Sequence, residues 1–258
     1  MYPYISIFGQ HFGTYGLCMV LGFFLPCVLT VRRGKPLGIT PEDVFITAAT
    51  ALLGALVCGG GLYVAVTYSF EEIIGFIRRG EFSFLGSGIV FYGGLIGGVL
   101  GALLGIGIAK CSLPAVERAT VPFIPLGHAV GRIGCVMAGC CHGFEYSGPF
   151  ALYYPNSVAG LDPAQGYFPV QLVEALANGL VCAALLRLSK KERKPFDLLF
   201  FYLGLYGVER FLLEILRGDE IRGIYGGLSV SQWISLGLLL ACGIHFLRQR
   251  LRKSAKVG

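Results

Sequence analysis

Charged residues are scarce in this chain. Only 14% of its 258 residues are Asp, Glu, Lys or Arg, whereas a soluble domain averages about 25%. Apolar residues make up 55% of the chain, and the mean hydropathy is +0.70. This is too little polar material to coat a compact globule, which argues against a soluble enzyme, a disordered chain and a nucleic-acid binder.

Two further features are missing. The 39 glycines follow no Gly-X-Y period, which excludes collagen and favours helices that approach closely in lipid. No basic residue precedes Arg32, so the first apolar segment lacks the positive n-region of a cleavable signal peptide. We therefore expect that segment to be retained as a helix.

Long runs without charge indicate membrane-spanning helices, because about 20 apolar residues cross a bilayer as a helix. Three such runs are Val44–Phe70, Phe82–Ala109 and Gly223–Leu247. The sequence predicts an all-α, polytopic membrane protein with about seven transmembrane helices in a single domain, residues 1–258. The predicted segments are 12–31, 44–67, 88–109, 120–141, 169–188, 196–217 and 229–247.

The basic residues predict how these helices are oriented. Of the 21 Lys and Arg residues, 15 follow the first, third, fifth and seventh segments, and only four lie in the opposite loops. The loop from Gly143 to Pro169 contains none. Because cytoplasmic loops collect positive charge, we expect the N-terminus outside and the C-terminus in the cytoplasm.

Ionisable residues inside the predicted helices are costly, about 2.5–3.5 kcal/mol each at the centre, so they indicate function. His128 and Arg132 lie four residues apart and share a helix face. Glycines at 127, 131, 134 and 139 should leave that side open. An Arg there suits an anionic headgroup, because its planar fork of donors matches phosphate oxygens. The alternative is an Arg that snorkels or pairs with a carboxylate of segment 196–217.

A second group lies on segment 196–217. Arg210, Glu214 and Arg217 are spaced as one helical stripe, so Glu214 could hold both arginines while their other donors face a ligand. A purely structural ladder of ion pairs is the alternative. Glu174 in segment 169–188 also needs a partner, and we expect an Arg from another helix in a structural role.

Nine cysteines are present, and Cys135, Cys140 and Cys141 cluster with His142. Such a group could suggest a metal site or a redox pair, but no CxxC…CxxC frame supports a closed zinc site. Packing around a glycine-lined turn is the favoured interpretation, and no metal or cofactor is predicted. His142 could titrate and act as a base.

Several segments together resemble the bacterial phosphatidylglycerol–prolipoprotein diacylglyceryl transferase family over nearly the whole chain. The sequence from Phe91 to Gly97 is similar to the family's Phe-His-Gly-Gly-Leu-Ile-Gly, and that from Gly131 to Cys140 resembles its Gly-Arg-x-Gly-Asn-Phe-x-Asn-Gly-Glu signature. Further matches are Tyr15–Leu17, Pro169–Glu174, Arg210–Arg217 with the following Asp219, and Leu228–Gln232.

The resemblance implies an enzyme of the bacterial inner membrane that uses no cofactor. Its substrates would be phosphatidylglycerol, or a similar anionic phospholipid, and the signal peptide of a preprolipoprotein, with no role for nucleic acid. The diacylglyceryl group would pass to the lipobox Cys thiol, and glycerol phosphate would leave. Arg132 and Arg210 would hold the phosphate, with Glu214 beside them. The remaining substrate-binding candidates are Gly131, Gly139, Gly143, His128 and Cys135.

The sequence departs from the family pattern at residues that bear on chemistry. Tyr92 stands where the family has its motif His, and Cys135 and Cys140 replace the signature Asn and Glu. Met19 and Gly60 replace a Tyr and an Arg. Tyr92 is a poor base, with an unperturbed pKa of about 10, so His142 or a substrate-assisted transfer would take the thiol's proton. Two alternatives stay open, namely a divergent paralogue that binds, transports or modifies another anionic lipid, and a thiol-redox membrane protein.

Overall fold

The computed structural model describes residues 2–7, 9–86, 88, 90–218 and 223–254. It divides into two compact units. The first contains Met1–Leu29 and Glu117–Gly258, and the second contains Thr30–Val116. Each unit is described by itself.

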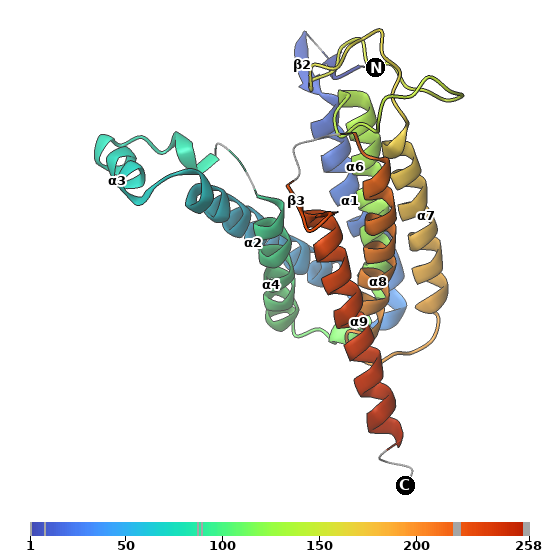
Figure 1. Ribbon diagram of the computed structural model, residues 1–258. Helices are drawn as coiled ribbons and strands as arrows, with labels where there is room; N and C mark the ends of the chain where they lie inside the picture. The colour runs from blue at the N-terminus through green and yellow to red at the C-terminus, as the bar shows by residue number, and fades with distance from the viewer. Residues whose placement is uncertain (1, 8, 87, 89, 219–222, 255–258) are drawn as a thin grey trace. The chain divides into compact units, whose positions relative to one another are not determined.

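The first unit is a helical bundle. A short antiparallel hairpin, β1 (Tyr4–Ile7) with β2 (Gln10–Gly13), precedes α1 (Thr14–Gly34). The other long helices run beside one another (Figure 1). They are α6 (Ile124–Ala138), α7 (Val170–Leu188), α8 (Asp197–Leu213) and α9 (Val230–Ser254). Val121, Leu185 and Leu198 form a buried cluster that holds α7 and α8 together.

The second unit is built on α2 (Pro41–Thr67) and α4 (Phe91–Ala109), which pack closely against each other (Figure 1). Glycines make this approach possible. A Cβ atom added at Gly93 would lie 2.9 Å from Leu62 Cβ and 3.0 Å from Gly59 Cα, closer than real side chains allow. The sequence prediction that Gly-rich helices pack closely is therefore confirmed for this pair.

Membrane-spanning length is reached by five helical runs among the described residues. These are Thr14–Leu37, Pro41–Thr67, Leu113–Ala138, Val170–Leu188 and Val230–Arg252. The runs containing α1, α2 and α9 bury only 6–11% of their most apolar windows, so their apolar side chains face outward, as lipid contact requires. The shorter apolar helix Gly93–Ala109 and the 17-residue α8 account for the other two predicted segments. Each of the seven predicted segments thus contains a helix, five of them in runs of spanning length, and a multi-pass membrane protein is supported.

Several boundaries differ from the predicted ones. The fourth segment starts earlier than residue 120, because α5 (Leu113–Thr120) and the 3-10 turn η3 (Val121–Phe123) lead into α6. The sixth segment was predicted to run to residue 217, but α8 ends at Leu213 and continues as the 3-10 turn η4 (Glu214–Leu216). The hairpin before α1 was not predicted.

The short helix α3 (Phe70–Arg79) was also missed, although the sequence carries its signal. Ser69 and Glu72 form a capping box, in which the Ser69 backbone N–H donates to Glu72 Oε2 at 2.8 Å and the Glu72 N–H donates to Ser69 Oγ at 3.4 Å. These hydrogen bonds lower the pKa of the Glu72 carboxyl, first through the backbone N–H of Ser69 and then through its hydroxyl. Gly80 ends the helix at φ +69°.

The glycine side of α6 is not open along its whole length, which corrects the sequence expectation. A Cβ atom at Gly22 of α1 would lie 2.8 Å from Gly127 O, and one at Gly134 would lie 2.8 Å from Cys18 Cβ. Gly127 and Gly134 therefore let α1 and α6 approach each other. At Gly131 an added Cβ would meet only Met19 Sδ, at 3.6 Å.

Candidate anion-binding site

Glu174 of α7 is the centre of a buried ionic network. Its side chain is only 2% exposed. Arg132 Nη2 of α6 lies 2.7 Å from Glu174 Oε1, and Arg217 Nη1 lies 3.8 Å from Glu174 Oε2. One carboxylate thus holds two guanidinium groups from different parts of the chain. The predicted Arg partner for Glu174 is confirmed, and Arg132 pairs with α7 rather than with a carboxylate of segment 196–217.

His128 joins this network from one turn earlier on α6, as the spacing of four predicts. Arg132 Nε donates to His128 Nε2 at 3.3 Å, and that ring nitrogen lies 3.9 Å from Glu174 Oε1. A nitrogen that accepts from a guanidinium carries no proton, so this geometry describes a neutral ring. The His128 ring also lies 5.8 Å from the Tyr206 ring of α8.

Arg210 is held where α8 meets the start of α9. Its Nη2 lies 2.5 Å from Glu214 Oε2 and donates to Ser231 Oγ at 3.1 Å. Ser229 Oγ donates to Glu214 Oε1 at 2.8 Å. The predicted helical stripe of Arg210, Glu214 and Arg217 is therefore interrupted, because Glu214 lies in the 3-10 turn η4. Glu214 holds Arg210, as the spacing predicts, and Arg217 also reaches Glu174.

Arg132 and Arg210 occupy one electrostatic neighbourhood. The carboxyl of Glu209 and the phenol of Tyr206, both on α8, each interact with both arginines. Asn178 Nδ2 of α7 donates to Glu209 Oε1 at 2.6 Å, which fixes this carboxyl between the helices. Sequence reasoning did not select Glu209 or Asn178. A signal for both was available, since polar side chains inside predicted spans are rare.

The turn after α6 is fixed by Gln171, the first polar side chain of α7. The fully buried Gln171 donates from Nε2 to Cys140 O at 2.9 Å and accepts from the Tyr154 hydroxyl at 3.2 Å. Burial raises the pKa of Tyr154 to about 12, so its hydroxyl stays a donor at neutral pH. Gly139 begins the turn at φ +69°, a conformation that favours glycine.

Three thiols gather in this turn. The Sγ atoms of Cys135, Cys140 and Cys141 all lie within 4.8 Å of one another. The pKa of the Cys141 thiol is lowered, because the Cys135 and Cys140 thiols hydrogen-bond to it and Arg217 adds its positive charge. The favoured interpretation of simple packing did not anticipate this convergence, since sequence adjacency does not reveal where side chains point.

His142 and Gly143 complete the turn. His142 Nδ1 lies 2.8 Å from Gly143 O, and its ring packs 4.9 Å from the Tyr167 ring. A carbonyl oxygen only accepts, so Nδ1 carries a proton, and the tautomer with this proton has Nε2 as its acceptor. Gly143 itself pairs with Arg217 through a backbone bridge, and a Cβ there would lie 2.9 Å from Phe168 Cβ.

Tyr92 lies in the first turn of α4 in the second unit, whereas the ionic network belongs to the first unit. Asp219, the acidic residue that follows the Arg210–Arg217 motif, lies outside the described residues.

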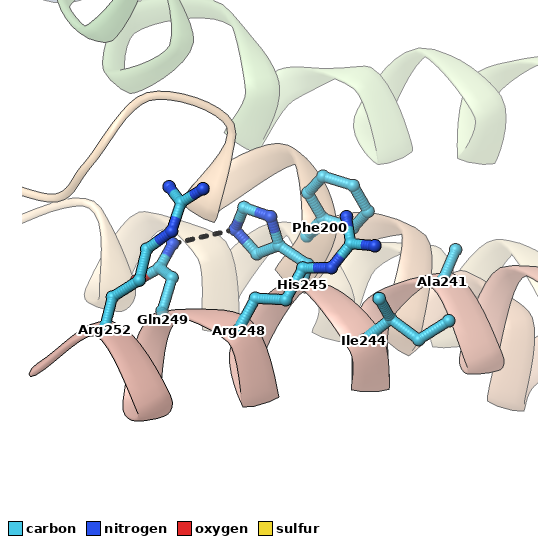
Figure 2. A pocket seen from close by; sticks show the side chains of 7 residues that line it. All are labelled: Phe200, Ala241, Ile244, His245, Arg248, Gln249 and Arg252. Carbon is cyan, nitrogen blue, oxygen red and sulfur yellow. Dashed lines mark hydrogen bonds between the residues drawn. The ribbon is translucent and has the colours of Figure 1, made fainter. Parts of the chain in front are cut away.

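A separate pocket of about 520 Å³ lies along α9. Figure 2 shows Arg248 and Arg252 rising from this helix on the same side as His245. His245 Nε2 lies 2.9 Å from Asp197 Oδ1 and 2.9 Å from Gln249 Nε2, and its ring stacks on Phe200. None of the predicted site residues lines this pocket.

The fold and the network together define a class. This is a multi-pass membrane protein with a buried cluster of guanidinium groups that carboxylates hold in place, an arrangement suited to an anionic lipid headgroup. Residues 3–248 match the family described as prolipoprotein diacylglyceryl transferase. The chain belongs to this transferase family, as its motifs indicated.

Curated relatives cover nearly the whole chain. A phosphatidylglycerol–prolipoprotein diacylglyceryl transferase of Clostridium tetani is 31% identical over 250 residues, which are 96% of this chain and 97% of the relative. A second such transferase of Clostridium perfringens is 30% identical over 98% of this chain and 97% of its own length. One from Bordetella bronchiseptica is 33% identical over 92% of this chain and 90% of its own.

Proposed function

We propose that this protein transfers the diacylglyceryl group of phosphatidylglycerol to the lipobox cysteine of a preprolipoprotein. The family match over residues 3–248 and the names of the relatives support the reaction. The observation that carries the proposal is the pair of buried arginines, Arg132 and Arg210, which share the neighbourhood of Glu209 and Tyr206.

The reaction is a substitution at carbon. The lipobox sulfur, after losing its proton, attacks the glyceryl carbon that carries the phosphate ester. A C–S bond forms and the C–O bond breaks. The electron pair stays on the phosphate oxygen, so glycerol phosphate leaves as an anion, and a thioether links the diacylglyceryl group to the peptide.

The arginines would bind the phosphate and stabilise the charge that develops on its leaving oxygen. Within the described part of the chain, Arg132 contacts His128 through Nε and Glu174 through Nη2, so Nη1 is the nitrogen that would face the anion. Glu174 and Glu214 are positioning residues that fix the two guanidinium planes. Of the three candidate glycines Gly131, Gly139 and Gly143, Gly131 has the most space beside it for a headgroup, since an added Cβ would meet Met19 Sδ at 3.6 Å.

A base must take the thiol proton, because an unperturbed Cys with a pKa of about 8.5 is mostly protonated near neutral pH. His142 fits this role best among the predicted candidates, since its bond to Gly143 O leaves Nε2 to accept. Tyr92 would then contact substrate rather than remove the proton. His128 would contribute to binding, because its Nε2 is already engaged by Arg132.

The same proposal includes the surroundings of the enzyme. It places the chain in the bacterial inner membrane as one seven-pass domain, with the N-terminus outside and the C-terminus in the cytoplasm. The turn at residues 139–143 would then lie near the outer surface, where a translocated signal peptide presents its lipobox.

The direct test supplies purified protein with phosphatidylglycerol and a lipobox peptide, and mass spectrometry detects the thioether product. We expect turnover by the natural chain and a loss of at least about 100-fold in Arg132→Ala and Arg210→Ala, the scale typical of removing one charge-stabilising donor. Arg79→Ala is the matched control, because the Arg79 side chain is 57% exposed and pairs with Glu81, two residues further along the chain.

Two results would contradict the proposal. One is well-folded protein that gives no product with both substrates present. The other is bound and recovered phosphatidylglycerol that stays intact, which would favour a protein that binds or transports anionic lipid.

A further inference from the structure

The thiol cluster in the turn after α6 supplies none of the bond-making or proton-transfer steps of the proposed transfer, although Cys135 is a substrate-binding candidate. Cys135 is the buried cysteine of α6, and Cys140 and Cys141 follow Gly139 in the turn. Their three Sγ atoms lie within 4.8 Å of one another. Two of them, Cys135 and Cys140, occupy positions where the family signature has an Asn and a Glu, so the cluster is a property of this chain that the family's chemistry does not explain.

We propose that Cys135, Cys140 and Cys141 form a three-thiolate binding site for a thiophilic metal ion, with Cu(I) as the best fit. Thiolates are soft ligands that select Cu(I) and zinc over the hard cations. Structural zinc sites almost always use four protein ligands in a tetrahedron, whereas this cluster offers three. A three-coordinate Cu(I) ion matches that number.

The distances suit a shared ion. Metal–sulfur bonds of about 2.3 Å place three sulfurs around a trigonal ion about 4.0 Å apart. The observed upper limit of 4.8 Å therefore needs sulfur shifts of less than 1 Å. Side-chain rotation alone can supply such shifts, so the backbone of the turn would stay in place.

That backbone is already fixed on both sides of the sulfurs. The Cys140 N–H donates to Cys135 O at 3.2 Å, Gln171 Nε2 donates to Cys140 O at 2.9 Å, and the Gly218 N–H donates to His142 O at 3.2 Å. A preformed ligand set loses little conformational freedom when the ion binds.

Charge also favours an ion here. Three thiolates carry three negative charges, and a monovalent metal neutralises only one of them. The guanidinium of Arg217 interacts with Cys141, and that of Arg132 interacts with Cys135 and Cys141. These two arginines, which also pair with Glu174, would offset much of the remaining charge in a setting where unpaired charges are costly.

The test uses the full chain in detergent, reduced and free of oxygen, with no lipid or peptide substrate. Cu(I) is titrated against a chromogenic chelator. We expect one equivalent to bind, and X-ray absorption should show a first shell of three sulfurs. Cys140→Ser and Cys141→Ser should each weaken Cu(I) binding by more than about 100-fold. Losing a residue that only hydrogen-bonds to a metal ligand weakens metal binding by about 10–100-fold, so a larger loss indicates a direct ligand.

Cys111→Ser and Cys58→Ser are matched controls, because both cysteines lie in or beside the second unit's helices, away from this turn in the sequence, and should leave the affinity unchanged. Cys135→Ser is less decisive, since the buried site could affect folding, and the other two variants carry the test.

Three outcomes would overturn the proposal. They are less than one bound equivalent after full reduction, unchanged binding in Cys140→Ser and Cys141→Ser, and tighter binding of Zn²⁺ than of Cu(I). A disulfide that persists between two of the cysteines in the reducing buffer would leave too few thiolates, so less than one equivalent of Cu(I) would bind. Because no transferase substrate is present, none of these results depends on the proposed reaction.

Discussion

At the scale of single residues, the decisive feature is one carboxylate shared by two arginines. Glu174 is 2% exposed and holds Arg132 and Arg217 at 2.7 and 3.8 Å. In water such pairs contribute little, but a buried charge that loses its partner is costly. Removing any one member of the network of Glu174, Arg132 and Arg217 therefore takes a partner away from another buried charge.

We expect Glu174→Gln to destabilise the protein by about 3–5 kcal/mol, the range for removing one partner of a buried ion pair, and to lower transfer activity together with stability. Thermal unfolding in detergent measures the first effect. Glu192→Gln is the control, because its side chain is 93% exposed beside Arg118 and should change stability by about 0–1 kcal/mol. Equal effects of the two substitutions would contradict the role of Glu174.

Arginine and lysine should not be interchangeable at residue 210. Arg210 contacts Glu214 and Ser231 through one nitrogen of a planar fork, and a lysine offers a single point charge without that geometry. Arg210→Lys should keep the fold yet lose most activity, at least about 10-fold. An activity close to that of the natural chain would show that charge alone is sufficient.

At the scale of elements, glycine sets how closely helices approach. Gly22 and Gly127 bring α1 against α6, the helix that carries Arg132 and His128. Any side chain at this contact must push the two helices apart, and a displaced α6 would move the guanidinium relative to α7.

Gly22→Ala should therefore cost about 1–3 kcal/mol of stability, as overpacking usually does, and should reduce activity. The new Cβ would lie 2.8 Å from Gly127 O. Gly16→Ala on the same helix is the control, because nothing lies within 4 Å of its added Cβ and alanine is the better helix former. Comparing the unfolding temperatures of the two variants checks this, and a more stable Gly22→Ala would refute the close contact.

At the scale of the whole molecule, the distribution of basic residues predicts the orientation. The loop Gly143–Pro169 has no Lys or Arg, while the last helix ends in a basic segment that contains Arg248, Arg250 and Arg252. Cytoplasmic loops collect positive charge, so these two regions should lie on opposite sides of the membrane.

Cysteine labelling in intact cells tests this orientation. A cysteine introduced at Asp162, in a variant whose exposed native thiols are replaced, should react with a membrane-impermeant maleimide added outside. A cysteine introduced at Gln249 should react only after the cells are opened. The reverse pattern would show that the positive-inside rule fails for this chain.

The sequence by itself determined that the chain is helical and membrane-embedded, because apolar runs and the scarcity of charge leave no other low-energy arrangement. It also selected Arg132, Arg210, Glu214 and Glu174 as candidates, since charges inside apolar helices are rare. The motifs were sufficient to indicate the family.

Only the tertiary structure decided which charges meet. Spacing put Arg217 on one helical stripe with Arg210 and Glu214, but α8 ends at Leu213, and Arg217 also reaches Glu174 on another helix. The same holds for the three thiols, which converge because the Gly139 turn folds residues 140 and 141 back onto Cys135. Contacts between helices depend on backbone directions set by packing and turns, and periodicity along one segment contains no information about them.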